Sequence, residues 1–207
     1  MNKTSLFVVA SAGVAALAGA AAWNFLQPGT DRFAACSTSS VAGATIGGPF
    51  TLVDETGVTV TEADVLTKPS LVYFGYTFCP DVCPTDSARN AEAIDLLAER
   101  GVDAQGVFIT IDPERDDVDR VREFTDFFHP DMIGLTGSTD QVSVASKAFK
   151  TYYRKQQTGD EYYLMDHSTY TYLVLPNEGF MQFFGREDAP QVIADTVACY
   201  LEAGGQS

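Results

Sequence analysis

The segment YFGYTFCPDVCPTD, residues 73–86, joins an apolar run to two cysteines and decides the expected fold. The residues before Cys79 are mostly uncharged β-formers, as in a strand that is covered on both faces. A helix is predicted to follow from about Cys83 or the next proline to Arg100, because proline suits the first helical turn and Gly101 is a typical stop. Both cysteines therefore lie where a strand passes into a helix.

Apolar periodicity along the rest of the chain alternates between strand and helix. This alternation predicts an α/β fold with a mixed central sheet flanked by helices, and cysteines at a strand-to-helix junction suggest a thioredoxin-like fold. The last helix is expected to begin with Asp188 as N-cap and Pro190 just inside. The expected strands are 70–76, 106–111, 169–175 and 180–184 with a hairpin around 55–57, and the expected helices are 83–100, 117–128, 138–150 and one from 188 onward.

The strongly negative charge of the chain limits the kinds of partner that it is expected to bind. Its 207 residues carry a formal net charge of −15, and the first 35 residues contribute only Lys3, Asp31 and Arg32 to the balance. Such an acidic domain repels nucleic acid phosphates and anionic lipid head groups, which excludes both as expected partners. A basic protein or a cation is favoured instead.

The N-terminus predicts a membrane anchor. Residues 6–26 form an uncharged run of 21 residues preceded by Lys3, long enough for one transmembrane helix with its N-terminus inside. A cleaved signal sequence is the alternative, and an uncleaved anchor is favoured because the run is long for a signal peptide. The expected organisation is an anchor at 1–27, a linker at 28–46 and a thioredoxin-like domain at 47–207, exported from a bacterial inner membrane into the periplasm.

The C-x-x-x-C spacing of Cys79 and Cys83 allows three kinds of chemistry. The start of a helix favours thiolate over thiol, because its free N–H groups and positive dipole end stabilise negative charge. A structural disulfide here would close a very short loop and add little stability. A redox pair needs one exposed sulfur of low pKa, whereas a metal site needs a third ligand.

His167 is the candidate third ligand, and it is one of only two histidines. It precedes the strand 169–175, which is expected to neighbour the cysteine loop. Asp166 could orient the imidazole, although alternation along an extended segment would turn it away. His129 falls at a helix end and is interpreted as structural. Two cysteines and one histidine suit Cu(I), or Cu(II) with a further ligand, better than a structural zinc ion.

Five segments together resemble the Sco/SenC family of membrane-anchored copper-binding proteins with a thioredoxin-like fold. They are GGPFTLVDETG, YFGYTFCPDVCPTD, IDPERDD, FHPDMIGLTG and DHSTYTYLV, and the resemblance covers about residues 47–203. It implies that Cys79, Cys83 and His167 bind copper. It also implies assembly of the CuA centre in cytochrome c oxidase subunit II, with copper taken from an upstream periplasmic donor.

Two functions remain open on this sequence. The favoured hypothesis is a metallochaperone that holds copper at an exposed rim and passes it on by ligand exchange. The alternative is a thiol-disulfide oxidoreductase, as some relatives resemble, which would need Cys79 and Cys83 but neither His167 nor copper. A peroxidase ranks last, because no arginine is evidently placed to activate a cysteine.

Three further residues need an interpretation. Cys36 and Cys199 could form a disulfide in an oxidising compartment, but Cys199 could equally be a small buried apolar residue, and we favour the unbridged state. Asp112, in IDPERDD, ends a strand at the rim that carries the cysteines. The segment is interpreted as a turn that leads into the N-cap of the next helix.

Overall fold

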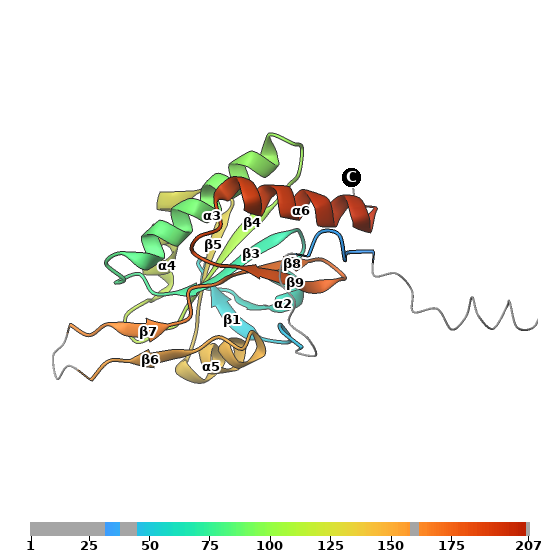
Figure 1. The fold of residues 1–207 in the computed structure, drawn as a ribbon. Helices are drawn as coiled ribbons and strands as arrows, with labels where there is room; N and C mark the ends of the chain where they lie inside the picture. The colour runs from blue at the N-terminus through green and yellow to red at the C-terminus, as the bar shows by residue number, and fades with distance from the viewer. Residues whose placement is uncertain (1–31, 38–44, 158–161, 206–207) are drawn as a thin grey trace, which may run out of the picture. The chain divides into compact units, whose positions relative to one another are not determined.

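The computed structural model describes residues 32–37, 45–157 and 162–205, and Figure 1 shows their arrangement. The described residues from Cys36 onward form one compact unit, which is distinct from the described residues before Cys36. Within the described residues, no helix is both long and apolar enough to cross a membrane. The predicted anchor at 6–26 lies outside those residues.

A mixed sheet of seven strands forms the centre of the fold. Its strand order is β2-β1-β5-β4-β3-β8-β9, in which β3, β4 and β5 run parallel and the other pairs are antiparallel. This matches the expected α/β fold with a mixed sheet. The strand bounds are β1 Thr51–Asp54, β2 Thr59–Thr61, β3 Ser70–Gly75, β4 Gln105–Thr110, β5 Met132–Thr136, β8 Thr171–Leu175 and β9 Gly179–Phe184.

Helices cover the sheet and bury its two central strands. Every residue of β3 and β4 is buried, which explains their nearly continuous apolar sequences. Figure 1 shows α3 and α6 above the sheet and α5 below it. The helix bounds are α2 Glu62–Val65, α3 Val82–Ala98, α4 Val118–Phe128, α5 Thr139–Ala148 and α6 Pro190–Gly204.

The local signals at helix ends are mostly confirmed. Asp117 caps α4 by accepting a hydrogen bond from the backbone of Arg120, and Ser138 forms the predicted capping box with Gln141. Gly101 follows α3 in the left-handed conformation, with φ of +77°, as expected of a helix stop.

The predicted N-cap of the last helix is wrong by one residue. Ala189 occupies that position, and Pro190 is the first helical residue. The carboxylate of Asp188 instead accepts a hydrogen bond from the backbone N–H of Gly185 at 2.7 Å. The preceding turn uses this side chain, which is an alternative that Asp residues commonly offer to the backbone.

A disulfide joins Cys36 to Cys199 across 163 residues, with 5.7 Å between their Cα atoms. The expectation that this pair stays unbridged is therefore wrong. Cys199 lies in α6 and Cys36 is 7% exposed, so the bond fixes Cys36 to the last helix. No local sequence pattern predicts this disulfide, because the pairing depends on how α6 packs in the tertiary structure.

Candidate metal centre

The strand register brings the cysteine loop close to His167. Strand β3 pairs antiparallel with β8, with Tyr73 opposite Thr171, so the end of β3 meets the beginning of β8. The cysteine loop leaves the end of β3, and His167 precedes β8, as the sequence predicts. His167 is not in a loop, however. It ends the short strand β7, Met165–His167, which pairs with β6, Tyr153–Lys155, in a separate two-stranded sheet.

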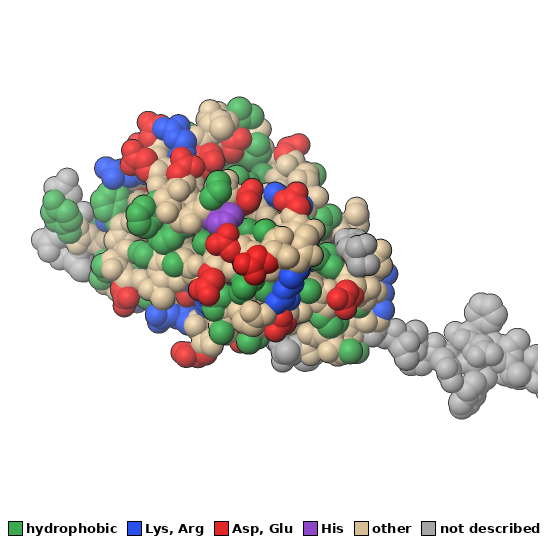
Figure 2. Space-filling view, turned by 90° about the horizontal axis from the view of Figure 1, so that it is seen from above, with side chains coloured by type: hydrophobic (Ala, Val, Ile, Leu, Met, Phe, Trp, Pro, Cys, Tyr) green, Lys and Arg blue, Asp and Glu red, His purple; other side chains and the backbone are tan. Residues whose placement is uncertain are grey.

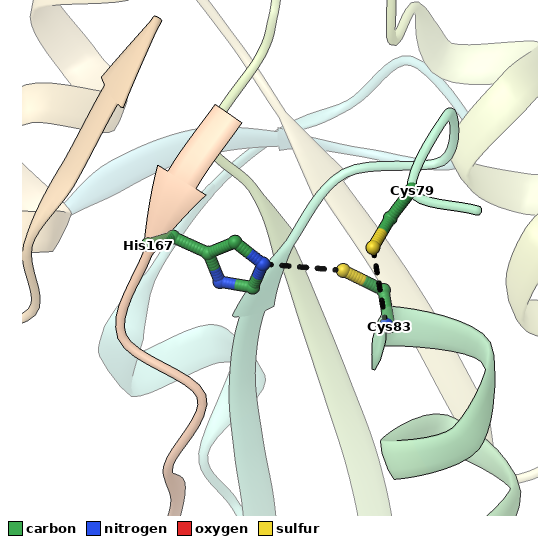
Figure 3. A group of neighbouring side chains, drawn as sticks. All are labelled: Cys79, Cys83 and His167. Carbon is green, nitrogen blue, oxygen red and sulfur yellow. Dashed lines mark hydrogen bonds between the residues drawn. The ribbon is translucent and has the colours of Figure 1, made fainter. Parts of the chain in front are cut away.

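Three ligand-type atoms converge at this point. The Sγ atoms of Cys79 and Cys83 and a ring nitrogen of His167 all lie within 4.8 Å of one another. Nε2 of His167 is 3.5 Å from Sγ of Cys83, and the backbone N–H of Cys83 donates to Sγ of Cys79 at 3.3 Å. Figure 3 shows the imidazole directed from the end of β7 toward the start of α3. Both cysteines are free thiols.

The imidazole of His167 is held by backbone and by aromatic rings. Its Nδ1 lies 2.8 Å from the carbonyl oxygen of Ser168. Because a carbonyl only accepts, Nδ1 carries the proton and Nε2 keeps its lone pair toward Cys83. The rings of Tyr73 and Tyr76 stand edge-on to the imidazole, at centroid distances of 6.4 Å and 5.8 Å. The side chain is therefore fixed in the tautomer that a metal requires.

The two thiols have opposite acidities. The hydrogen bond with Cys83 is the largest cause that lowers the pKa of Cys79, which the nearby His167 ring and the backbone N–H groups of Cys83 and Asp81 also lower, to about 3, although burial opposes this. The hydrogen bond to Cys79 and burial raise the pKa of Cys83. At neutral pH the metal-free pair therefore holds one proton, with the negative charge on Cys79.

Asp166 does not orient the imidazole. Its carboxylate accepts hydrogen bonds from Arg154 at 2.9 Å and from Gln156 at 2.6 Å, which places it on the other side of β7. Successive side chains along a strand point to opposite faces, so Asp166 points away from the face that carries His167, as alternation along an extended segment predicts. Ser168 takes the orienting role through its backbone oxygen. Residue type carries no signal for a backbone carbonyl, so sequence reasoning missed it.

His129 lies apart from the metal group, as expected. It is the C-cap of α4, and its Nε2 is 3.1 Å from a carboxylate oxygen of Asp95. Met165, at the start of β7, is only 9% exposed and packs in the core.

A family model described as SCO1/SenC matches residues 38–202 of this sequence. The chain belongs to the SCO1/SenC family. Protein SenC of Rhodobacter capsulatus is 52% identical over 203 residues, which cover 98% of this chain and 92% of SenC. A mitochondrial SCO1 homolog of Arabidopsis thaliana is 42% identical over 159 residues, which cover 76% of this chain but only 48% of that protein.

Solved structures of the SCO1/SenC family share this fold. The copper-bound crystal structure of Arabidopsis thaliana ScoI has a TM-score of 0.71 at 40% identity and covers 76% of this chain and 99% of that one. The copper-bound crystal structure of yeast Sco1 has a TM-score of 0.69 at 34% identity and covers 77% and 90% respectively. The mixed sheet with flanking helices is thus the architecture of the family.

A buried carboxylate anchors the cysteine loop of this SCO1/SenC chain, and sequence reasoning missed it. Asp116 is fully buried and accepts hydrogen bonds from the hydroxyl of Thr77 at 2.6 Å, from the backbone N–H of Thr77 at 2.9 Å and from the hydroxyl of Thr110 at 2.6 Å. Burial is the largest effect on Asp116 and raises its pKa, while these hydrogen bonds lower it. Thr77 stands two residues before Cys79, so Asp116 ties the metal loop to the end of β4.

Asp112 lies at the edge of the sheet that carries the cysteine loop, but it does not contact the metal group. Its carboxylate accepts hydrogen bonds from the hydroxyl of Tyr163 at 2.8 Å and from Nε of Arg115 at 2.5 Å. Its backbone carbonyl accepts from the N–H groups of Arg115 and Asp116, which closes the predicted turn before α4. Asp112 is therefore a turn and packing residue.

The three ligand-type side chains fit a thiophilic metal better than a structural zinc. Cys79 and His167 line an open cavity of about 250 Å³, together with Tyr76 and Leu164, whereas Cys83 is completely buried behind them. Within the described residues, the grouping contains no fourth histidine, cysteine or carboxylate. Three donors that include two sulfurs match the low coordination number and softness of Cu(I).

Proposed function

We propose that this chain is a copper metallochaperone that helps to assemble the CuA centre of cytochrome c oxidase, with copper held by Cys79, Cys83 and His167. The observation that carries the proposal is the convergence of two sulfurs and one ring nitrogen within 4.8 Å at the edge of an open cavity. Membership of the SCO1/SenC family and the copper-bound structures of its relatives support it.

Loading uses the unequal acidities of the two thiols. Cys79 is the thiolate and lines the cavity, so it meets an incoming copper ion first. Nε2 of His167 already presents its lone pair, since Nδ1 is engaged by Ser168. Cys83 completes the site by releasing its proton, which makes copper uptake dependent on pH.

Release proceeds by ligand exchange. A three-coordinate site leaves room for an incoming thiolate from the recipient, so copper passes between proteins without becoming a free ion. The partially exposed His167 and the cavity-lining Cys79 are the ligands that a recipient displaces first, and the buried Cys83 is the last.

The recipient in this proposal is cytochrome c oxidase subunit II, and the donor is a periplasmic copper protein. The N-terminal segment anchors the chain in a bacterial inner membrane, with residues 47–207 in the periplasm. The uncharged run at 6–26 supports this placement.

A deletion strain complemented with variants tests the function. Wild-type chain and added copper should each restore oxidase activity, while His167→Ala should fail to restore it at low copper. His129→Ala is the matched control, because it removes the other histidine outside the metal group. Full activity with His167→Ala at limiting copper would overturn the ligand assignment.

A thiol-disulfide reductase remains a second candidate because the two free cysteines adjoin one another, with the backbone N–H of Cys83 donating to Sγ of Cys79 at 3.3 Å. The lowered pKa of Cys79 and the raised pKa of Cys83 agree with this role. The Cys79 thiolate would attack a disulfide of the target, and Cys83 would resolve the mixed disulfide, leaving the target as a dithiol and this pair oxidised. This chemistry needs no imidazole ligand, so rescue by His167→Ala together with a failure of Cys83→Ser would favour it.

A further inference from the structure

A rim of exposed aromatic side chains lies beside the metal cavity. Phe78 directly precedes Cys79 and is 40% exposed, and Phe127 on α4 is 81% exposed. The guanidinium carbon of Arg120 lies 5.0 Å from the centre of the Phe78 ring. We call Phe78, Arg120, Phe124 and Phe127 the aromatic rim. Aromatic and arginine side chains in this combination are typical of the energetically important centres of protein interfaces.

Two cavities meet at the aromatic rim. One, of about 590 Å³, is lined by Phe78, Arg120, the ion-paired Glu114 and Arg115, and residues of the β6–β7 hairpin. The other, of about 410 Å³, is lined by Arg120, Glu123, Phe124 and Phe127. The second cavity also reaches Pro84, the residue after Cys83. A protein seated on the rim therefore contacts Phe78 and Pro84, which are the sequence neighbours of Cys79 and Cys83.

Among the described cations that line these two cavities, Arg120 is the one whose side chain forms no ion pair. Arg115 pairs with Asp112 at 2.5 Å, and Lys155 pairs with Glu114 at 2.8 Å. Within the part of the chain that the structure describes, the side chain of Arg120 forms no ion pair and stacks on an aromatic ring. An exposed guanidinium against a ring is well placed to receive a carboxylate from another protein.

The acidic charge on the rest of the chain makes Arg120 a selective position for a carboxylate of a partner. The chain carries a net charge of −15, and Figure 2 shows Asp and Glu side chains spread over one face, with Lys and Arg in a few separate places. A carboxylate of a partner is repelled by such a surface in general and attracted at Arg120. Local complementarity of this kind fixes the orientation of a partner more than it raises the affinity.

We propose that the aromatic rim is the docking surface for the protein that receives the metal. The partner presents a carboxylate to Arg120 and an apolar side chain to the groove at Phe124 and Phe127. The identity of the partner rests on the proposed function, because we take it to be the CuA domain of cytochrome c oxidase subunit II. The surface itself follows from the exposed rings, the two cavities and the guanidinium of Arg120 over the ring of Phe78, the residue before Cys79.

The test is the dissociation constant of the full-length chain, in detergent, for the metal-free CuA domain of its own oxidase. We expect Arg120→Glu and Phe127→Ala each to raise this constant about tenfold or more, as loss of an interface centre does. Arg122→Glu is the matched control. It makes the same charge change two residues away on α4, where Arg122 pairs with Asp119, and should alter the constant less than about twofold.

The outcomes separate this proposal from the proposed function. Equal dissociation constants for wild type, Arg120→Glu and Arg122→Glu, or no complex with wild type, would overturn the docking surface. A complex that depends on Arg120 but transfers no copper would support the surface and reject the chaperone function. Loss of self-association in Arg120→Glu, measured by analytical ultracentrifugation of the chain alone, would assign the rim to a second copy and overturn the proposal.

Discussion

Nδ1 of His167 lies 2.8 Å from the carbonyl oxygen of Ser168, and Nε2 on the opposite side of the ring lies 3.5 Å from Sγ of Cys83. The backbone therefore selects the tautomer of the only histidine in the metal group. Metal-binding imidazoles are commonly oriented by a hydrogen bond on their second nitrogen, often from a carboxylate. Here the neighbouring carboxylate, Asp166, is engaged elsewhere.

This relationship predicts that Asp166→Asn leaves copper binding almost unchanged. Removal of a carboxylate that orients a ligand costs about 10–100-fold in metal affinity, but Asp166 contacts Arg154 and Gln156 instead of the imidazole. We expect less than about a threefold change for Asp166→Asn and a loss of more than about 100-fold for His167→Ala, consistent with the removal of a ligand. Competitive copper titration measures both, and similar losses for the two variants would contradict the assignment.

Alkylation of the metal-free chain should depend weakly on pH at Cys79. A pKa lowered to about 3 means that Cys79 is already a thiolate at pH 5 and protonates only as the pH falls toward 3. An ordinary cysteine instead reacts about tenfold faster per pH unit up to its pKa of about 8.5. Peptide mass spectrometry after timed reaction with iodoacetamide at pH 5 and pH 7 gives the rates for each cysteine.

The Cys83→Ala variant tests the cause of that low pKa. The hydrogen bond from Cys83 is the largest effect that lowers the pKa of Cys79, so its removal should raise this pKa. The alkylation rate of Cys79 at pH 5 should then fall, and its pH dependence should steepen. A rate profile identical to wild type would contradict this cause, because the helix start and His167 would then keep the pKa of Cys79 low without the Cys83 thiol.

Asp116 should be important for the stability of the cysteine loop. Asp116→Ala would leave the hydroxyls of Thr77 and Thr110 and one backbone N–H without their acceptor. We expect the free energy of unfolding to fall by about 3 kcal/mol, because buried hydrogen bonds to a charged group are lost. Asp117→Ala, which removes only the exposed N-cap of α4, should cost about 1 kcal/mol. Urea unfolding of both variants measures the difference.

The Cys36–Cys199 disulfide should stabilise the domain without affecting copper. Intact-mass and peptide analysis under non-reducing conditions should find this pair linked, with Cys79 and Cys83 free. Because the bridge closes a loop of 163 residues, Cys199→Ser should lower the free energy of unfolding by about 2–5 kcal/mol. The double variant with Cys36→Ser should match the single one, and an additional loss would indicate that packing of the cysteines, and not the bond, carries the effect.

The amino-acid sequence determined the order of the main elements and the position of the cysteines. Apolar runs specify β3 and β4, capping residues such as Ser138 specify helix starts, and Cys79 and Cys83 lie at the junction of β3 and α3, because each of these signals is local. Four short elements, α2, β5, β6 and β7, were not predicted, since elements of three to five residues leave little periodicity to detect.

Only the tertiary structure decided which groups hold the imidazole, the cysteine loop and the last helix in place. The carboxylate of Asp116 and the bond between Cys36 and Cys199 each join segments whose contact depends on how the strands and helices pack, whereas the carbonyl of Ser168 holds the imidazole of the residue before it. A backbone oxygen has no residue-type signature, and a buried aspartate resembles a turn residue in sequence. The residue types of the three candidate ligands could therefore be predicted from the sequence. Most of the contacts that hold these ligands in place could not, because they form between elements that only the fold brings together.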